Sequence, residues 1–126
     1  MKRIFTLLTV TAILTSFTFS SGIDDIVNAL REGNAAQVAR YFDNTVEITL
    51  PDKTNSYSKS QAEMILRDFF MTNSIKGFDI IHKGENAGSQ YCIGTLFTKV
   101  ASYRTTIFMK QKGDRQTLQE IRFENR

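Results

Sequence analysis

Residues 41–70 read YFDNTVEITLPDKTNSYSKSQAEMILRDFF, and this stretch decides the fold. Apolar and polar side chains alternate over residues 46–50, which predicts a strand with one buried face. Pro51 and Asp52 then begin a turn, after which residues 55–58 return as a short second strand. The stretch therefore opens with a predicted β-hairpin.

The hairpin leads into a long predicted helix. Ser60 and Glu63 have the spacing of a capping box, and the helical pattern runs to about residue 72. The apolar stripe that we expect to face the core consists of Ala62, Ile65, Leu66 and Phe69. Met64 and Met71 lie on the opposite side of this helix. We expect the preceding helices to cover them, although flexible methionines also suit a partner surface.

Two short helices are predicted before this stretch. Apolar residues recur at helical spacing over residues 23–30, and Gly33 ends the first helix. Asn34, followed three residues later by Gln37, offers a cap to the second helix. The residues that this second helix would bury are Ala35, Val38, Ala39 and Phe42.

The chain after Asn73 shows no helical period. Strands are predicted at residues 75–83, 90–100, 103–112 and 116–124. The turns between them are short, so these strands should pair as an antiparallel meander. Strands of this length must twist and curl, and Gly94 marks a bend or a bulge. The predicted class is therefore α+β, with two short helices and one long helix packed in a curled, mainly antiparallel sheet.

The first 22 residues have the layout of a secretory signal peptide. Lys2 and Arg3 precede an apolar run over residues 4–19, and small residues follow up to Gly22. The alternative is a membrane anchor, but the run is shorter than the roughly 20 apolar residues that a spanning helix needs. We therefore predict cleavage near Gly22 and a single domain over residues 23–126. This domain would be exported to the periplasm or the cell exterior, without a stable membrane anchor after cleavage.

The charge balance disfavours nucleic acid as a partner. Lys2 and Arg3 are the only charged residues before residue 23, so removal of the leader leaves 14 of the 16 basic residues against all 13 acidic ones, a formal charge of +1. Binding to duplex nucleic acid needs a concentrated basic surface, which this sequence lacks. Cys92 is the only cysteine, so no internal disulfide can form, and we expect a buried thiol.

The order of elements, with residues 42–70 at its centre, resembles the nuclear transport factor two-like superfamily. Its cone-shaped, cystatin-like fold also serves ketosteroid isomerases and polyketide cyclases. A closer resemblance, to small exported bacterial members of unknown function, rests on Tyr91, Ile93-Gly94, Tyr103-Arg104 and Ile121-Arg122-Phe123-Glu124. The resemblance implies a sheet wrapped around the long helix, with a pocket at the wide end of the cone. It also implies that two copies of the chain can pair through the sheet face as a homodimer.

The residue inventory excludes most enzyme classes that a sequence can reveal. His82 is the only histidine, so a multi-histidine metal site is excluded, and His82 with Cys92 alone makes a poor zinc pair. The sequence has no glycine-rich phosphate loop, nucleophile elbow or calcium-loop spacing. We therefore expect neither a metal nor a cofactor. Acid–base chemistry in a pocket remains, because it leaves little trace in a sequence.

His82 is the best single candidate for a polar group in such a pocket. It shares the predicted strand face of Phe78 and Ile80, and an imidazole titrates near neutral pH. The candidate ligand-binding residues are His82, Tyr57, Tyr91 and Tyr41, although tyrosines also suit the core and its rim. Glu47 and Asp79 alternate with apolar neighbours and should face solvent. The sequence therefore shows no inward carboxylate that could serve as a general base.

Arg104 and Arg122 are candidates for an interface or for contact with an anion. Arg122 alternates with Glu120 and Glu124 on the last predicted strand, and Arg104 lies on the strand before it. These side chains would form a charge ladder across the two strands. The ladder is either a solvated outer face that adds little stability, or a polar dimer surface or anion clamp.

Two functions are left open. The favoured one is a non-catalytic exported domain that binds a small ligand or a protein partner. The alternative is a pocket enzyme of the isomerase, dehydratase or cyclase type, with His82 as acid or base. A cone filled by aromatic side chains would exclude the enzyme, and the chain has ten phenylalanines. The residues that we expect to fill it are Phe69, Phe97, Phe108 and Phe123.

Overall fold

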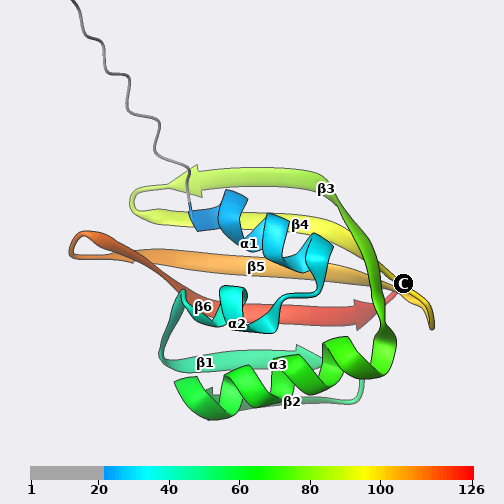
Figure 1. Cartoon of the computed structure of the whole chain (residues 1–126). Coiled ribbons are helices and arrows are strands. Elements are labelled where there is room, and N and C mark those ends of the chain that lie inside the picture. The colour runs from blue at the N-terminus through cyan, green and yellow to red at the C-terminus, as the bar shows by residue number, and fades with distance from the viewer. Residues whose placement is uncertain (1–21) are drawn as a thin grey trace, which may run out of the picture.

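The computed structural model describes residues 22–126, so the predicted signal peptide, apart from Gly22, lies outside the described residues. The elements follow the predicted order (Figure 1): α1 (Gly22–Glu32), α2 (Ala35–Ala39), β1 (Phe42–Leu50), β2 (Lys53–Ser58), α3 (Lys59–Asn73), β3 (Ile75–Asn86), β4 (Ser89–Thr98), β5 (Ser102–Lys112) and β6 (Arg115–Asn125). The α+β class is confirmed. Within residues 22–126, no helix is long and apolar enough to span a membrane.

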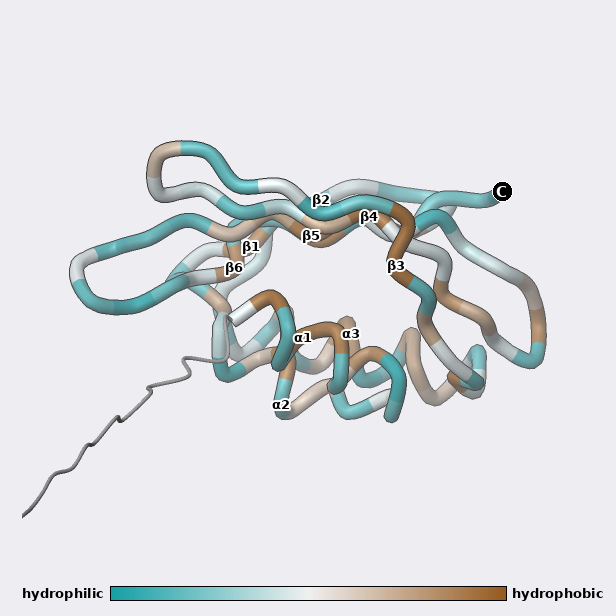
Figure 2. The backbone as a smooth tube through the Cα atoms, turned by 90° about the horizontal axis from the view of Figure 1, so that it is seen from above, coloured by the Kyte–Doolittle hydropathy of each residue, from teal (hydrophilic) through white to brown (hydrophobic). Residues whose placement is uncertain are grey.

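The strands form one mixed, six-stranded sheet in the order β2-β1-β6-β5-β4-β3. Neighbouring strands pair antiparallel, except that β1 runs parallel to β6 and so joins the hairpin to the predicted meander. The sheet curls without closing, and Figure 2 shows all three helices on one of its faces. We call this the inner face. The opposite, outer face is covered by no described helix.

The start of α3 differs from the prediction. Ser58 and Gln61 form the capping box: the Ser58 hydroxyl accepts a hydrogen bond from the Gln61 backbone N–H, and the Gln61 side chain accepts one from the Ser58 N–H. The predicted pair of Ser60 and Glu63 is wrong, because β2 runs up to Ser58 and the helix begins at Lys59. Glu63 pairs instead with Arg67 one turn later, at 2.7 Å.

The second helix is shorter than predicted. The side chain of Asn34 caps it by accepting a hydrogen bond from the Gln37 N–H, as expected, but the helix ends at Ala39. Phe42 is 2% exposed, so it is buried as predicted, yet it is the first residue of β1 rather than part of the helix. The parallel pairing of Phe42 with Leu118 draws this residue into the sheet.

A β-bulge in β3 decides where His82 points. Ile80 pairs with Gly94 and His82 pairs with Ile93, so one extra residue lies between the two pairs on β3. An inserted residue reverses the alternation of side chains between the two faces of a sheet. His82 therefore lies on the outer face, whereas Phe78 is buried on the inner face. The prediction that they share a face is wrong.

Gly94 permits this bulge by allowing a close approach of β3. A Cβ atom on Gly94 would lie 2.4 Å from the ring of Phe78 and 2.5 Å from the carbonyl oxygen of Asp79. Such distances are too short for any side chain. The irregularity predicted at Gly94 thus falls on the partner strand.

Aromatic rings fill the space between α3 and the sheet. The ring centroid of Phe69 lies 4.7 Å from that of Phe123 and 5.3 Å from that of Tyr103. The Tyr103 hydroxyl donates to Asn73 Oδ1 at 2.7 Å, and Asn73 Nδ2 donates to the Phe69 carbonyl oxygen at 2.9 Å. The polar atoms of this buried cluster are therefore satisfied by one another.

Candidate functional site

His82 and Tyr91 are the only two of the four predicted ligand-binding residues that meet. Nε2 of His82 lies 2.8 Å from the hydroxyl oxygen of Tyr91, and their ring centroids are 5.5 Å apart. Tyr91 pairs with Gly84, two residues after His82 on β3, so both rings project from the outer face. The pair is exposed to solvent and does not enter the interior of the fold.

Tyr41 serves a structural contact instead. Its hydroxyl donates to the Asp25 carboxylate and so joins the α2–β1 connection to α1. Burial raises the pKa of Tyr41 to about 12, with smaller contributions from the hydrogen bond to Asp25 and from its negative charge.

Tyr57 lies near the opposite edge of the sheet, on β2. It is half-buried against the core, and Asn55 Nδ2 is 3.4 Å from its hydroxyl oxygen. With Gln61, Met64 and Ile65 it lines a hollow of about 170 Å³. It is therefore separated from His82 by the width of the sheet.

The two candidate arginines lie on the outer face, as the alternation predicts. Arg104 pairs with Glu124 in the register of β5 and β6, and Thr106 pairs with Arg122. Arg122 is also held by two carboxylates of its own strand, Glu120 and Glu124, each at 3.7 Å. Because acidic groups already face Arg122, the geometry favours the charge ladder over an anion clamp.

An apolar patch lies next to these charges. We call Tyr91, Ile93 and Phe108 the outer-face patch; Phe108 pairs with Tyr91 on one side and with Glu120 on the other. Phe108 is 36% exposed, and Phe97 at the end of β4 is 39% exposed, so neither fills the cone as predicted. The signal that could have placed Phe108 was the alternation along β5, where Ile107 and Met109 on either side of it are buried.

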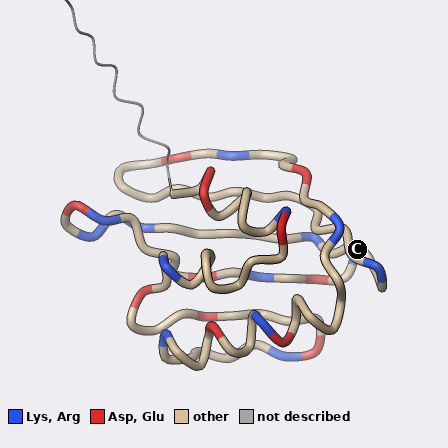
Figure 3. The backbone as a smooth tube through the Cα atoms, viewed as in Figure 1, with Lys and Arg blue, Asp and Glu red and all other residues tan. Residues whose placement is uncertain are grey.

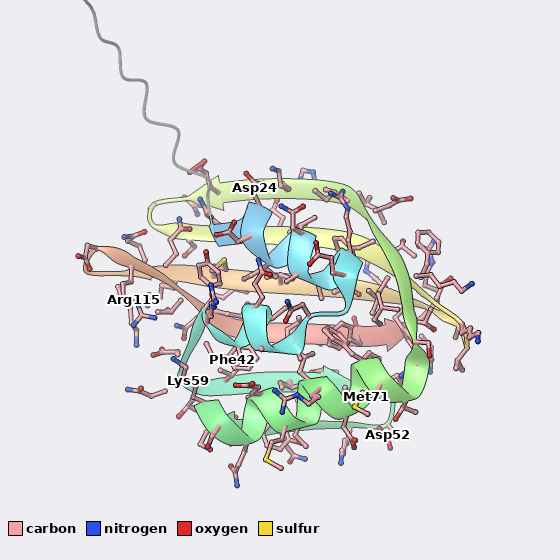
Figure 4. The ribbon with its side chains drawn as sticks, viewed as in Figure 1. Asp24, Phe42, Asp52, Lys59, Met71 and Arg115 are labelled. Atoms are coloured by element: carbon pink, nitrogen blue, oxygen red, sulfur yellow. The ribbon has the colours of Figure 1, made fainter. Side chains whose placement is uncertain are left out.

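Hollows larger than the one beside Tyr57 also lie on the helical side of the molecule. One of about 470 Å³ is bounded by residues 32–36 of the α1–α2 turn and by Arg67, Phe70 and Met71 of α3. Met71, labelled near the end of α3 in Figure 4, is 73% exposed, so the expectation that the helix pair covers it is wrong. The second hollow, of about 280 Å³, lies between Ile23 and the β3–β4 hairpin.

Two ionisable groups outside these hollows show shifted pKa values with structural causes. Lys112 at 2.7 Å and Gln119 at 2.9 Å donate to the Asp43 carboxylate, which lowers its pKa to about 2. Cys92 is buried, as predicted, and burial raises the pKa of its thiol. Within residues 22–126, no three His, Cys, Asp or Glu side chains gather in a way that could hold a metal ion.

A curled, unclosed sheet around three helices is the architecture of the nuclear transport factor two-like and cystatin-like folds, as the resemblance implied. A domain of unknown function with a cystatin-like fold from Nostoc punctiforme superposes with a TM-score of 0.64. It is 8% identical, over 83% of this chain and 73% of that chain. At this level of identity the likeness concerns the fold alone.

The chain belongs to the family described as domain of unknown function DUF4783, whose model matches residues 23–124. A member from Bacteroides uniformis is 23% identical, over 82% of this chain and 95% of that chain, with a TM-score of 0.79. One from Bacteroides fragilis is 27% identical, over 81% and 96%, with a TM-score of 0.77. No curated protein matches the chain.

Proposed function

We propose that this chain is an exported, non-catalytic protein-binding domain that pairs with a second copy of itself through the outer face of its sheet. The observation that carries the proposal is the outer-face patch: Tyr91, Ile93 and the exposed ring of Phe108 project from a face that no described helix covers. Clustered apolar side chains on an uncovered face are typical of an interaction surface.

The filled interior argues against a function inside the cone. A ligand pocket of the usual kind is a cavity of about 300–1,000 Å³ with a few polar groups directed into it. Here the packed rings of Phe69 and Phe123 occupy that space, and the polar atoms of Tyr103 and Asn73 are already bonded to each other. Recognition is therefore expected at the surface of the molecule, where the outside of the sheet carries the apolar patch.

The charges beside the patch favour a second copy as the partner. Along β6 the signs alternate at Glu120, Arg122 and Glu124 (Figure 3), and Arg104 lies opposite Glu124. A two-fold interface brings the same surface of both copies together, so it needs a surface that is complementary to itself. A mixture of both signs around an apolar centre meets this condition, because an arginine of one copy can lie against a glutamate of the other.

The alternative enzyme, of the isomerase, dehydratase or cyclase type, has less support. It requires His82 next to a tyrosine inside a pocket that excludes water. His82 does contact Tyr91, but the contact lies on the exposed outer face. An exposed imidazole can contact a protein partner, but no enclosed substrate site surrounds it.

A small-ligand function has one observation in its favour, the hollow of about 470 Å³ beside α3. Its volume lies within the range of ligand sites, and its lining combines Arg67, which is paired with Glu63, with the apolar residues Phe70 and Met71. Crystals soaked with a library of small acids would test it. Density beside Arg67 that is lost in Arg67→Ala would support this candidate, and an empty hollow across the library would remove it.

The dimer is tested by exporting the full chain, purifying the processed protein and measuring its mass in solution by sedimentation. We expect a dimer for the wild type and a monomer for Phe108→Glu, which places a carboxylate at the centre of the outer-face patch and beside Glu120. Met71→Glu is the matched control, because Met71 is exposed on the helical side. A wild-type monomer, or a Phe108→Glu dimer, would overturn pairing through this face. If the protein is a monomer and binds a different protein through Phe108, that protein would be the partner of the outer-face patch in place of a second copy.

A further inference from the structure

The backbone nitrogen of Gly22, the first residue of α1, lies inside a small enclosure. Gly22 is buried, and its N–H donates to Oε1 of Gln116 at 2.7 Å. The methyl group of Met109 and the ring of Tyr41 lie 3.0 Å and 3.2 Å from the position that a Cβ atom would take on Gly22. Side chains from β5, β6 and the α2–β1 connection therefore close around the start of α1.

A second hydrogen-bond acceptor near this point is unmatched. Among residues 22–126, Oε1 of Gln90 is buried without a hydrogen-bond partner. Gln90 pairs with Met109 in the register of β4 and β5, and it lines the hollow of about 280 Å³ together with Ile23. A buried acceptor without a donor costs free energy, so this glutamine suits a donor that the internal peptide chain does not supply.

The surroundings also favour a positive charge. Asp24 and Asp25 lie in the first turn of α1, and Asp25 accepts the hydrogen bond of Tyr41, whose ring lies against Gly22. Figure 4 shows Asp24 at this end of the helix, where Lys83 pairs with it at 3.3 Å. The helix dipole alone disfavours a cation at an N-terminus. The negative charges of Asp24 and Asp25 in the first turn oppose that effect.

We propose that this enclosure is the docking site of the mature amino terminus. A signal peptidase would hydrolyse the peptide bond between Ser21 and Gly22, adding water so that the leader keeps the new carboxylate and α1 begins with an ammonium group on Gly22. A peptide N–H offers one hydrogen, whereas an ammonium offers three and can donate to Gln116 and Gln90 together. This bond joins two small residues, Ser21 and Gly22, as is usual at a cleavage site.

This inference rests on the export proposed above and not on the dimer. The full chain is expressed with its leader, and the exported protein is purified and weighed by mass spectrometry. We expect Gly22 as the first residue. A chain that keeps its leader would overturn both export and this inference. A chain that loses its leader but begins at any residue other than Gly22 would overturn the docking site alone. The sedimentation measurement that tests the dimer is independent of this mass-spectrometry result.

The docked amine is then tested by its reactivity. Acetylation of the terminal amine should be about tenfold slower than in an unfolded peptide with the same first residues, because the helix end must open first. Gln116→Leu and Gln90→Leu should each restore the faster rate, while Gln111→Leu, at an exposed glutamine on β5, should not. If Gln116→Leu fails to fold, the acetylation rates of the wild type and of Gln90→Leu test the docking site. A wild-type amine that reacts as fast as the peptide, or equal rates in Gln90→Leu and Gln111→Leu, would overturn the site.

Discussion

His82 Nε2 lies 2.8 Å from the Tyr91 hydroxyl on the outer face of the sheet, whereas the ring of Phe78, four residues before His82, is buried on the inner face. The bulge between Ile80 and His82 produces this separation. It moves the only histidine of the chain from the predicted pocket to an exposed surface. The same face carries Ile93 opposite His82, so the imidazole borders the outer-face patch.

The aromatic cluster should dominate the stability of the fold. Phe123 is fully buried between Phe69 and Phe70, so Phe123→Ala should lower the free energy of unfolding by about 3–5 kcal/mol. Phe97→Ala is the control, because this ring is 39% exposed and its removal should cost about 1 kcal/mol or less. Urea unfolding followed by circular dichroism measures both. Equal losses in the two variants would show that the interior is not packed as described.

The position of the α3 cap predicts different roles for two nearby serines, Ser58 and Ser60. Ser58→Ala removes the acceptor for the Gln61 N–H and should cost about 1 kcal/mol, within the 0.5–2 kcal/mol range typical of caps. Ser60→Ala lies inside α3 and should change the unfolding free energy by about 0.5 kcal/mol at most. Thermal unfolding of both variants provides the comparison. A larger loss for Ser60→Ala would restore the cap that the sequence predicted.

The cap shows how far sequence patterns reach. Ser58 with Gln61 and Ser60 with Glu63 satisfy the same spacing, so only the end of β2 at Ser58 decides between them. The pairing of β2 with β1, which extends to Ser58, sets this boundary, and local propensity does not report it. The order of elements was predictable because each hydrophobic period is a local property of the chain.

The candidate site was less predictable for the same reason. A bulge adds one residue to one strand, and Gly94 marks the position without saying which strand bulges. Every outward side chain after the bulge depends on that choice. The placement of Arg104 and Arg122 on the outer face was predictable, because their positions follow plain alternation on β5 and β6.

Acid should weaken the fold through Asp43. Folding lowers its pKa to about 2, against about 4 in an unfolded chain, through hydrogen bonds from Lys112 and then Gln119. The ionised carboxylate therefore stabilises the fold above about pH 4, and this contribution is lost as the pH falls towards 2. Asp43→Asn should flatten the pH dependence of stability in that window. Lys112→Gln should move the loss to higher pH, because it removes the largest cause of the shift.

These two variants are compared by urea unfolding at a series of pH values between about 2 and 7, the range over which carboxylates titrate. The wild type should show the steeper decline below about pH 4. An unchanged acid slope in Asp43→Asn would mean that this carboxylate does not link β1 to β6 in solution, although Gln119 and Lys112 both bond to it here.

Gly94 and Gly77 form a matched pair for testing the bulge itself. A methyl group on Gly94 would meet the Phe78 ring at 2.4 Å and the Asp79 carbonyl oxygen at 2.5 Å, and the second of these is backbone that cannot rotate away. Gly94→Ala should therefore lower the free energy of unfolding by about 1–3 kcal/mol, the usual cost of overpacking. Gly77→Ala, whose Cβ would meet nothing within 4 Å, should change it by about 0.5 kcal/mol at most.

Urea unfolding measures the cost of each glycine variant, and the amide and imidazole NMR signals of His82 report the local structure. Because the close approach of β3 at Gly94 accompanies the bulge that turns His82 outward, Gly94→Ala should also shift the His82 signals, whereas Gly77→Ala should leave them unchanged. If Gly94→Ala were as stable as the wild type with His82 unmoved, β3 would not approach Gly94 this closely. The assignment of His82 to the outer face would then lose its structural basis.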